Sequence, residues 1–251
     1  MKLKTEENLW LQDIRKSEYV IGIVKTTVVC LLILYVFYGS FIMAPFIIPV
    51  WMLYMRDWIT DMSGKKEQQF RNQFRDSIQE MSSVLKAGYS VENAIHEVNR
   101  DLGPMYEKDA RIRKEYDRMV HQLEMKIPVI SVLEAFAVRT GQEDVEDFVN
   151  VFTAAKKSGG DSITIIRNAV RIISEKIDTE KEIQTMIASK KFEFEIMCAV
   201  PFAIILYMKL TFREFLSILY GNTAGVIIMT ICLIVYIAAY ITGRKIIRIE
   251  V

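Results

Sequence analysis

The sequence contains few cysteines and histidines and no excess of either charge. The three cysteines, Cys30, Cys198 and Cys232, lie in or beside apolar segments, and their spacing matches no zinc or redox motif and gives no disulfide framework. His96 and His121 stand alone without Cys-His ligand spacing, so neither a metal site nor a cofactor is expected. The 32 basic and 31 acidic residues nearly cancel. Since proteins that bind nucleic acids normally carry a basic excess or stripe, no nucleic-acid partner is expected either.

The residue combinations that form active sites are also missing from the sequence. No nucleophile–base pair, paired-carboxylate site or cofactor motif emerges. Gly159-Gly160 precedes a helix start, where phosphates often bind, but no strand comes before it and no Gly-Lys-Thr/Ser ending follows. A helix break explains these glycines better, so the protein is expected not to be an enzyme and to have no catalytic residues.

The charges that are present are strongly segregated along the chain. Residues 20–55 contain a single charge, Lys25, and residues 223–243 contain none, whereas the middle carries most of the Asp, Glu, Lys and Arg. A soluble domain would mix these compositions, so the sequence predicts an integral membrane protein with one aqueous domain. The predicted parts are an N-terminal segment (1–19), a transmembrane hairpin (20–55), a helical domain (56–195), a second transmembrane hairpin with a short amphipathic external loop (196–243) and a tail (244–251).

The apolar segments predict about four transmembrane helices. A spanning helix needs roughly 20 apolar residues, so residues 20–55 are too long for one crossing and just long enough for two, with a break at residues 38–40. Pro45 and Pro49 make the second half irregular, and a single span followed by an interfacial segment is the alternative, so whether residues 41–55 cross the membrane stays open. The other two spans are predicted from Ile196 to about 210 and over residues 223–242.

The orientation follows from the basic residues that flank these spans, because cytoplasmic flanks carry the excess of Lys and Arg. The hairpin loops contain no net charge. Both termini and the central domain are therefore expected on the cytoplasmic side of a multi-pass protein in the cytoplasmic (inner) membrane. The flanking basic residues are Arg15, Lys16, Lys65, Lys66, Arg71, Lys190, Lys191, Arg244, Lys245 and Arg248.

The central domain reads as helical throughout. Apolar residues recur at helical spacing, as in Phe70, Phe74, Ile78, Met81 and Leu85, and no alternating strand pattern occurs. Six tightly joined helices indicate an all-α, antiparallel six-helix bundle. They are predicted at about 65–86, from 90 to about 103, at about 105–124, from 128 to 141, at 143–157, and from 161 or 162 onward into the third membrane segment.

Several motifs occur in a fixed order between about Phe70 and Pro201. Residues 85–95 have the form Leu-x-Ala-Gly-x-Ser-x-x-x-Ala, and Pro128-Val129 leads to residues 133–136, Leu-Glu-Ala-Phe. Arg-Thr-Gly at 139–141 precedes an acidic helix, and Ser-Gly-Gly-Asp follows at 158–161. In this order the chain resembles the type II secretion system F domain family of inner-membrane platform proteins. It is most similar to the Flp/Tad pilus-assembly branch, TadB and TadC.

The resemblance implies a non-enzymatic assembly role. Such platforms contact a hexameric cytosolic secretion ATPase and are thought to couple its motion to the addition of pilin or pseudopilin subunits. The implied partners are that ATPase, the transmembrane helices of pilins, a paralogous platform protein or a second copy, and membrane lipid. Ile127 departs from the family pattern, which usually has glycine before this turn. The turn and packing positions expected to matter are Gly88, Ser90, Ala94, Glu134, Gly159, Gly160 and Pro201.

Two charged features have both a structural and a functional interpretation. The acidic residues at the start of the 143–157 helix either complement its helix dipole on a solvated face or form a docking patch for a basic surface of the ATPase or a neighbouring platform subunit. Lys25 either extends its ammonium to the interface or pairs with a carboxylate on a pilin or a partner platform protein. The acidic residues are Glu143, Asp144, Glu146 and Asp147.

A membrane transporter subunit with cytoplasmic helical extensions is the alternative function. Such proteins usually need about six spans, with extensions continuous with most of them. Four spans and one compact insert argue against it.

Overall fold

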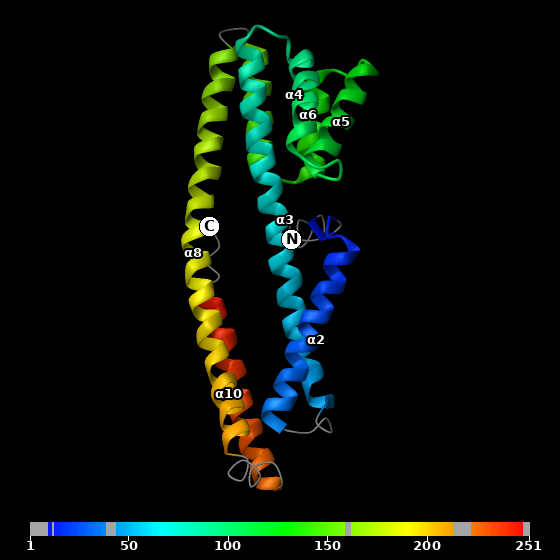
Figure 1. The fold of residues 1–251 in the computed structure, drawn as a ribbon. Coiled ribbons are helices and arrows are strands. Elements are labelled where there is room, and N and C mark those ends of the chain that lie inside the picture. Colours follow the sequence, from blue (N-terminus) through cyan, green and yellow to red (C-terminus); the bar gives the residue numbers. More distant parts are fainter. Residues whose placement is uncertain (1–9, 12, 39–43, 159–161, 213–221, 248–251) are drawn as a thin grey trace. The chain divides into compact units, whose positions relative to one another are not determined.

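The computed structural model describes residues 10–11, 13–38, 44–158, 162–212 and 222–247, and these residues are helices joined by short turns (Figure 1). The all-α fold class predicted from the sequence is confirmed. The helices are α2 (Lys16–Tyr38), α3 (Ala44–Lys86), α4 (Val91–Met105), α5 (Arg111–Glu124), α6 (Val129–Thr140), α7 (Glu143–Ser158), α8 (Ser162–Thr211) and α10 (Thr223–Ile247).

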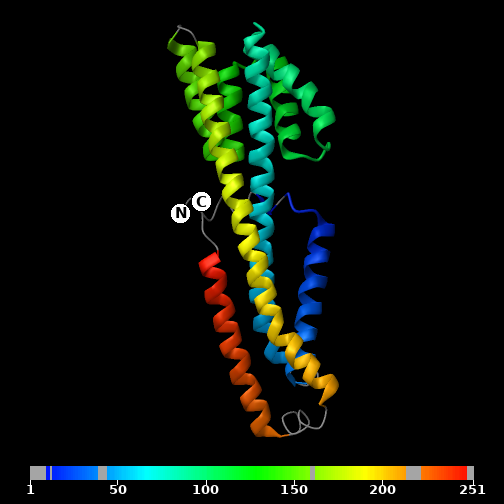
Figure 2. The same cartoon turned by 60° about the vertical axis from the view of Figure 1, so that its left-hand side comes forward.

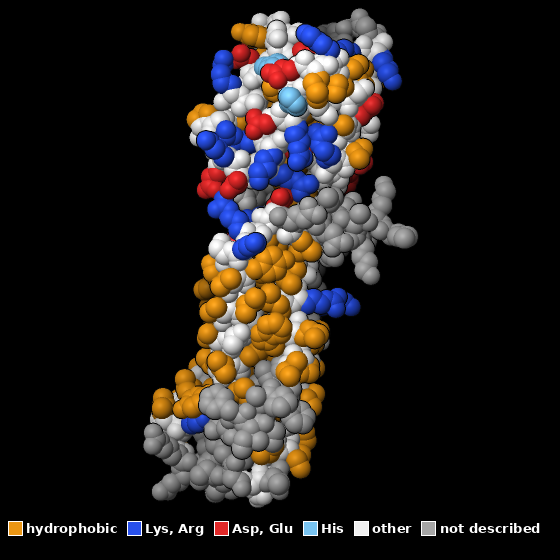
Figure 3. All heavy atoms as spheres, turned by 90° about the vertical axis from the view of Figure 1, so that its right-hand side faces the viewer, with side chains coloured by type: hydrophobic (Ala, Val, Ile, Leu, Met, Phe, Trp, Pro, Cys, Tyr) orange, Lys and Arg blue, Asp and Glu red, His pale blue; other side chains and the backbone are white. Residues whose placement is uncertain are grey.

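The chain divides into two compact units. The first, called the bundle unit here, combines the segment that ends at Ile14 with Asp61–Thr179. The second, called the apolar unit, combines Arg15–Thr60 with the chain from Glu180 onward. Charged side chains gather over the bundle unit and hydrophobic ones over the apolar unit (Figure 3), so the segregation seen in the sequence is also a segregation of surfaces.

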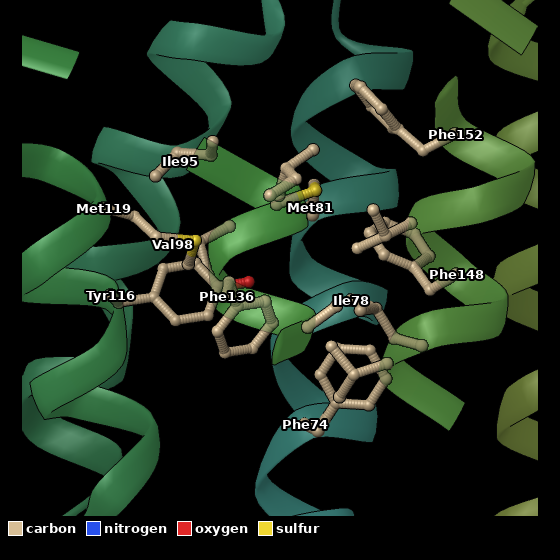
Figure 4. Close-up of a cluster of buried hydrophobic side chains, with 14 of the residues drawn as sticks. Phe74, Ile78, Met81, Ile95, Val98, Tyr116, Met119, Phe136, Phe148 and Phe152 are labelled. Atoms are coloured by element: carbon tan, nitrogen blue, oxygen red, sulfur yellow. The ribbon is translucent and has the colours of Figure 1, made fainter. Parts of the chain in front are cut away.

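The core of the bundle unit is built around the apolar stripe of α3. All five residues of that predicted stripe are buried. In both ribbon views α4 and α5 lie on one side of this part of α3 and the start of α8 lies on the other (Figures 1 and 2). Figure 4 shows Phe74, Ile78 and Met81 facing side chains from the surrounding helices, and burial of each large apolar side chain contributes roughly 1.5–3 kcal/mol. The facing residues are Ile95, Val98, Tyr116, Met119, Phe136, Phe148 and Phe152.

Helix α3 is longer than the sequence predicts. It runs unbroken from Ala44 to Lys86 with Pro49 inside it, so the predicted helix start at about Lys65 is wrong. No capping residue followed by an apolar run separates the two predicted segments, and Gly64 alone costs only about 1 kcal/mol in a helix. The prediction that the last helix of the domain continues into the third apolar segment is confirmed by α8, which spans Ser162–Thr211.

The predicted start of the third bundle helix, at about residue 105, is also wrong. Helix α5 begins at Arg111, with Ala110 as its N-cap residue. The preceding turn is stabilised by contacts that are distant in sequence: the Arg113 guanidinium donates to the carbonyl oxygens of Gly103 and Tyr106, and the Tyr106 hydroxyl donates to Asp76. These hydrogen bonds stabilise the C-terminal end of α4 and the turn that follows it. The residues of the turn are therefore not part of α5.

The apolar unit has its own core. Helix α2 contacts α10, and the hydroxyl groups of Tyr38 and Thr230 lie 3.1 Å apart. Over the described residues three helices are long and apolar enough to cross a membrane, Lys16–Tyr38, Ile163–Thr211 and Ala224–Ile246. The predicted span at residues 41–55 is not among them. Of the predicted hairpin break at 38–40, Tyr38 is the last residue of α2 and residues 39–40 lie outside the described residues, as does the predicted amphipathic loop at 213–220. The buried core residues are Cys30, Ile33, Leu34, Val36, Phe37, Tyr38, Met229 and Leu233.

Candidate functional site

The junction between α3 and α4 is formed by the Gly88–Ala94 motif. Gly88 has a positive φ of 92°, a left-handed conformation that side chains with a Cβ disfavour. Ser90 is the N-cap of α4 and its side chain accepts a hydrogen bond from the backbone N–H of Asn93 at 3.3 Å. Ala94 is fully buried in the core. The motif therefore sets where α3 ends and how α4 packs.

The other predicted turn and packing residues have different surroundings. Glu134 is exposed on α6, and α6 ends at Gly141, which has a positive φ of 59°. Pro201 lies inside α8 and is exposed. Gly159 and Gly160 lie outside the described residues. Glu134 therefore lies outside the buried core, and its predicted role stays a prediction.

The acidic start of α7 divides into one buried and three exposed carboxylates. Asp144 is 2% exposed. Nε of Arg71 donates a hydrogen bond to its Oδ2 atom at 2.8 Å, and Nη2 forms an ion pair with the same atom at 2.7 Å. Its Oδ1 atom forms an ion pair with Lys176 Nζ at 2.9 Å. Asp144 therefore connects α7 to α3 and α8 through these charged contacts. The exposed residues, called the acidic face here, are Glu143, Glu146 and Asp147.

A second buried carboxylate, Glu115 on α5, was not predicted from the sequence. It is 2% exposed and forms ion pairs with Arg139 at 2.7 Å and with Arg118 at 2.8 Å. Arg139 belongs to the Arg-Thr-Gly motif at the end of α6, so this ion pair gives that motif a structural role. Nothing in the local sequence distinguishes Glu115 from the exposed acids around it.

The segment before α2 forms part of the bundle unit. Trp10 is 2% exposed, its ring lies 5.3 Å from that of Phe70, and the Arg111 guanidinium sits 4.5 Å over it. Asp13 forms an ion pair with Arg111 at 2.9 Å, and Ile14 is buried as well. The sequence predicted no contact between residues 1–19 and the domain. The spacing of Trp10 and Ile14, four residues apart in a polar segment, was the available signal.

Aromatic and charged side chains meet at one end of the apolar unit. Tyr19 of α2 contacts Trp58 of α3 edge to face, with ring centroids 6.0 Å apart. Arg244 near the end of α10 forms an ion pair with Asp57 at 2.9 Å and donates to the Asp57 carbonyl oxygen. Aromatic residues of this kind concentrate at membrane–water interfaces. This end of the unit therefore has the composition of an interface.

Lys25 and Lys209, which lie within apolar stretches of α2 and α8, differ in their contacts. Lys209 of α8 lies 3.6 Å over the Tyr35 ring and donates to the Tyr35 carbonyl oxygen. Lys25 is exposed on α2, and within the described part of the chain its ammonium forms no ion pair or hydrogen bond. Over the described residues no group of three or more His, Cys, Asp and Glu is arranged to hold a metal ion.

The comparisons with known proteins give one match. The family described as type II secretion system (T2SS), protein F, matches residues 77–209, more than half of the chain. The chain belongs to this family. No curated protein and no solved structure matches it.

The match to the protein F family begins in the last turns of α3 and ends near the end of α8. It therefore includes the Gly88–Ala94 junction, the buried ion pair at Glu115 and the acidic face. Together with the apolar helices, it identifies a membrane protein of a secretion or pilus platform family.

Proposed function

We propose that this protein is the inner-membrane platform of a type IV pilus of the Flp/Tad type or of a type II secretion machine, and that it couples a cytosolic secretion ATPase to the assembly of pilin or pseudopilin subunits. The match of residues 77–209 to the protein F family carries this proposal. In this proposal the protein acts by contacting other proteins and does not catalyse a covalent reaction. The unbroken helix α8, which includes residues of both units, transmits displacement of the bundle unit to the membrane helices.

The position of Trp10 supports a second membrane crossing before the bundle unit. Trp10 and Phe70 pack in the same unit, on either side of the chain segment 15–60 in sequence. If α2 crosses the membrane once, the chain must cross back before Asp61 for these two rings to meet. The start of α3 is the segment available for that crossing.

The ion pair between Arg244 and Asp57 supports a C-terminus on that same side. Asp57 lies four residues before Asp61, about 6 Å along α3, so in this proposal the end of α10 lies near the membrane interface that α3 crosses. The basic flanking residues then favour the cytoplasm as that side. Four spans, with both termini and the bundle unit cytoplasmic, are part of the proposal.

The acidic face is the proposed contact for the ATPase. Its three carboxylates are exposed, and Glu143 among them also forms an ion pair with Lys176 at 3.5 Å. Complementary charges mainly accelerate and orient an encounter, so a basic surface on the ATPase would suit this face.

Deletion of the gene tests the function, and charge removal tests the contact. We expect deletion to abolish surface fibres or secretion and wild-type protein to restore them. The variant Glu143→Gln/Glu146→Gln/Asp147→Asn should restore them poorly and co-purify with less ATPase. A control variant, Asp101→Asn/Asp109→Asn/Glu124→Gln, removes the same charge from α4, α5 and the turn between them and should behave as wild type.

Two results would contradict the proposal. Normal fibres and secretion in the deletion strain would exclude an assembly role, and loss of solute transport instead would favour the transporter subunit. A reporter fused within residues 107–110, the turn between α4 and α5, that faced the exterior would exclude contact with a cytosolic ATPase.

A further inference from the structure

Lys25 lies in the middle of an otherwise apolar face of α2. One side of α2 is packed within the apolar unit, where Gly22, Thr26 and Cys30 are buried. A Cβ at Gly22 would overlap the Trp58 ring, so α2 and α3 approach closely there. The opposite side, called the Lys25 face, is exposed over about three turns. It consists of Ile21, Val24, Lys25, Val28 and Leu32.

The depth of Lys25 separates it from the interface. It lies six residues after Tyr19, about 9 Å further along the helix, and Tyr19 with Trp58 marks the interfacial end of the unit. A charged lysine inside the apolar region of a spanning helix is energetically unfavourable. Extension of the side chain toward the interface offsets part of this unfavourable free energy. An ion pair with a carboxylate at the same depth would offset more of it.

Lys209, which lies in an apolar stretch of α8, is an ammonium with partners inside the apolar unit. The ring and carbonyl oxygen of Tyr35 hold Lys209 within the unit. Lys25 has no equivalent within the described residues and points away from the packed side of α2. None of the described residues therefore supplies a counter-charge to Lys25.

We propose that the Lys25 face binds a membrane-spanning helix of a partner that carries one carboxylate in its apolar segment, at the depth of Lys25. This inference rests on the proposed function, in which the platform handles such helices. The apolar residues of the face supply packing along several turns, and Lys25 selects the helix by its charge. A lipid phosphate suits the site less well, because phosphates lie at the interface.

Full-length protein in phosphatidylcholine vesicles tests the inference with a synthetic probe. The probe is a Leu/Ala spanning peptide with one Glu six residues inside an interfacial Trp, and its matched form has Gln in place of Glu. Energy transfer from labelled protein to labelled peptide measures binding. We expect the Glu peptide to bind roughly fivefold to tenfold more tightly than the Gln peptide, the range of a polar contact between membrane helices.

Variants of the protein identify the residue responsible. Lys25→Gln should bind both peptides equally, Lys25→Arg should keep the preference, and Lys245→Gln, which removes a charge from the end of α10, should behave as wild type. Equal binding of the two peptides by wild-type protein would overturn the inference, as would a preference that survives in Lys25→Gln. Loss of the preference when phosphatidylglycerol is added would also overturn it, since the headgroup would then occupy Lys25.

A second arm separates this inference from the proposed function. If deletion of the gene leaves fibre assembly and secretion intact, the platform function itself fails. If deletion abolishes them but Lys25→Gln restores them fully and keeps the wild-type preference for the Glu peptide, only the role of Lys25 fails. Normal helical content of Lys25→Gln by circular dichroism shows that the variant is folded.

Discussion

Two nitrogen atoms of Arg71 on α3 contact a single carboxylate oxygen of Asp144, the second residue of α7: Nε donates a hydrogen bond and Nη2 forms an ion pair. The two residues are 73 positions apart in the sequence. Lys176 of α8 completes the site from the other side of the carboxylate at 2.9 Å. One buried charge thus joins three helices of the bundle unit.

Asp144→Asn should destabilise the bundle unit by about 2–3 kcal/mol. Removing one partner of a buried ion pair typically costs more, about 3–5 kcal/mol, but Arg71 and Lys176 keep 15% and 39% of their side-chain exposure and regain some solvation. Urea unfolding of the full-length protein, followed by the fluorescence of Trp10 with Trp51 and Trp58 replaced by Phe, measures this loss. Asp147→Asn is the control, because this neighbouring acid is exposed, and an equal effect of both changes would contradict the assignment.

Trp10→Ala should release the segment before α2 from the bundle unit. The change removes the contacts with Phe70 and Arg111, and truncation of a buried Trp or Phe costs about 3–5 kcal/mol. Limited trypsin digestion of the full-length protein should then cut at Arg15 or Lys16 at least about tenfold faster, as expected when a local opening becomes easier. Leu11→Ala, at the half-buried neighbour, should change the rate much less. Unchanged cleavage in Trp10→Ala would show that the segment is held by other contacts.

Substitution of alanine for glycine should have opposite effects at Gly88 and Gly64. Beyond the neighbouring residues, no atom lies within 4 Å of a Cβ placed at either position, so the backbone conformation decides the effect. At Gly88 the positive φ should make Ala destabilising by about 1–2 kcal/mol. Gly64 is inside α3, where Ala should stabilise by about 0.5–1 kcal/mol. The same unfolding measurement separates the two cases, and shifts of the same sign would be inconsistent with the backbone geometry.

Two tyrosines should make the bundle unit sensitive to alkaline pH. Burial raises the pKa of the Tyr116 hydroxyl well above its ordinary value of 10.0, against a smaller opposing effect of Ser77. Burial, and then the hydrogen bond and charge of Asp76, raises the pKa of Tyr106. Both phenols are protonated in the folded protein, so their contribution is complete below about pH 10 and falls above it, by up to about 1.4 kcal/mol per pH unit for each group.

The urea midpoint of wild-type protein between about pH 8 and about pH 11 checks this dependence. Tyr116→Phe removes one titrating group and should flatten the decline above pH 10 relative to wild type. A decline of the same steepness in both proteins would assign the effect to other groups, such as the lysines.

Sequence patterns predicted the parts of the fold that depend on local periodicity. The stripe from Phe70 to Leu85, the acidic start of α7 at Glu143 and the continuous α8 appear as predicted, because helical spacing and first-turn acids are encoded within a few residues. The stop at Gly88 and the cap at Ser90 also follow from local chemistry.

The parts that could not be predicted depend on residues distant in sequence. The turn before α5 is held by Tyr106 bonding to Asp76, thirty positions away. Among four adjacent acids, only Asp144 faces Arg71, and composition alone does not separate it from Asp147. The contact between Trp10 and Phe70 could not be predicted, because an entire apolar segment separates the two residues in the sequence.

The burial of Trp10 also affects how the domain should be produced in isolation. A soluble fragment limited to residues 61–179 would lack this side chain and would leave Phe70 and Arg111 facing an empty site. Joining residues 10–14 to that fragment through a flexible linker, in the manner of a circular permutation, would restore the missing ring without the membrane helices.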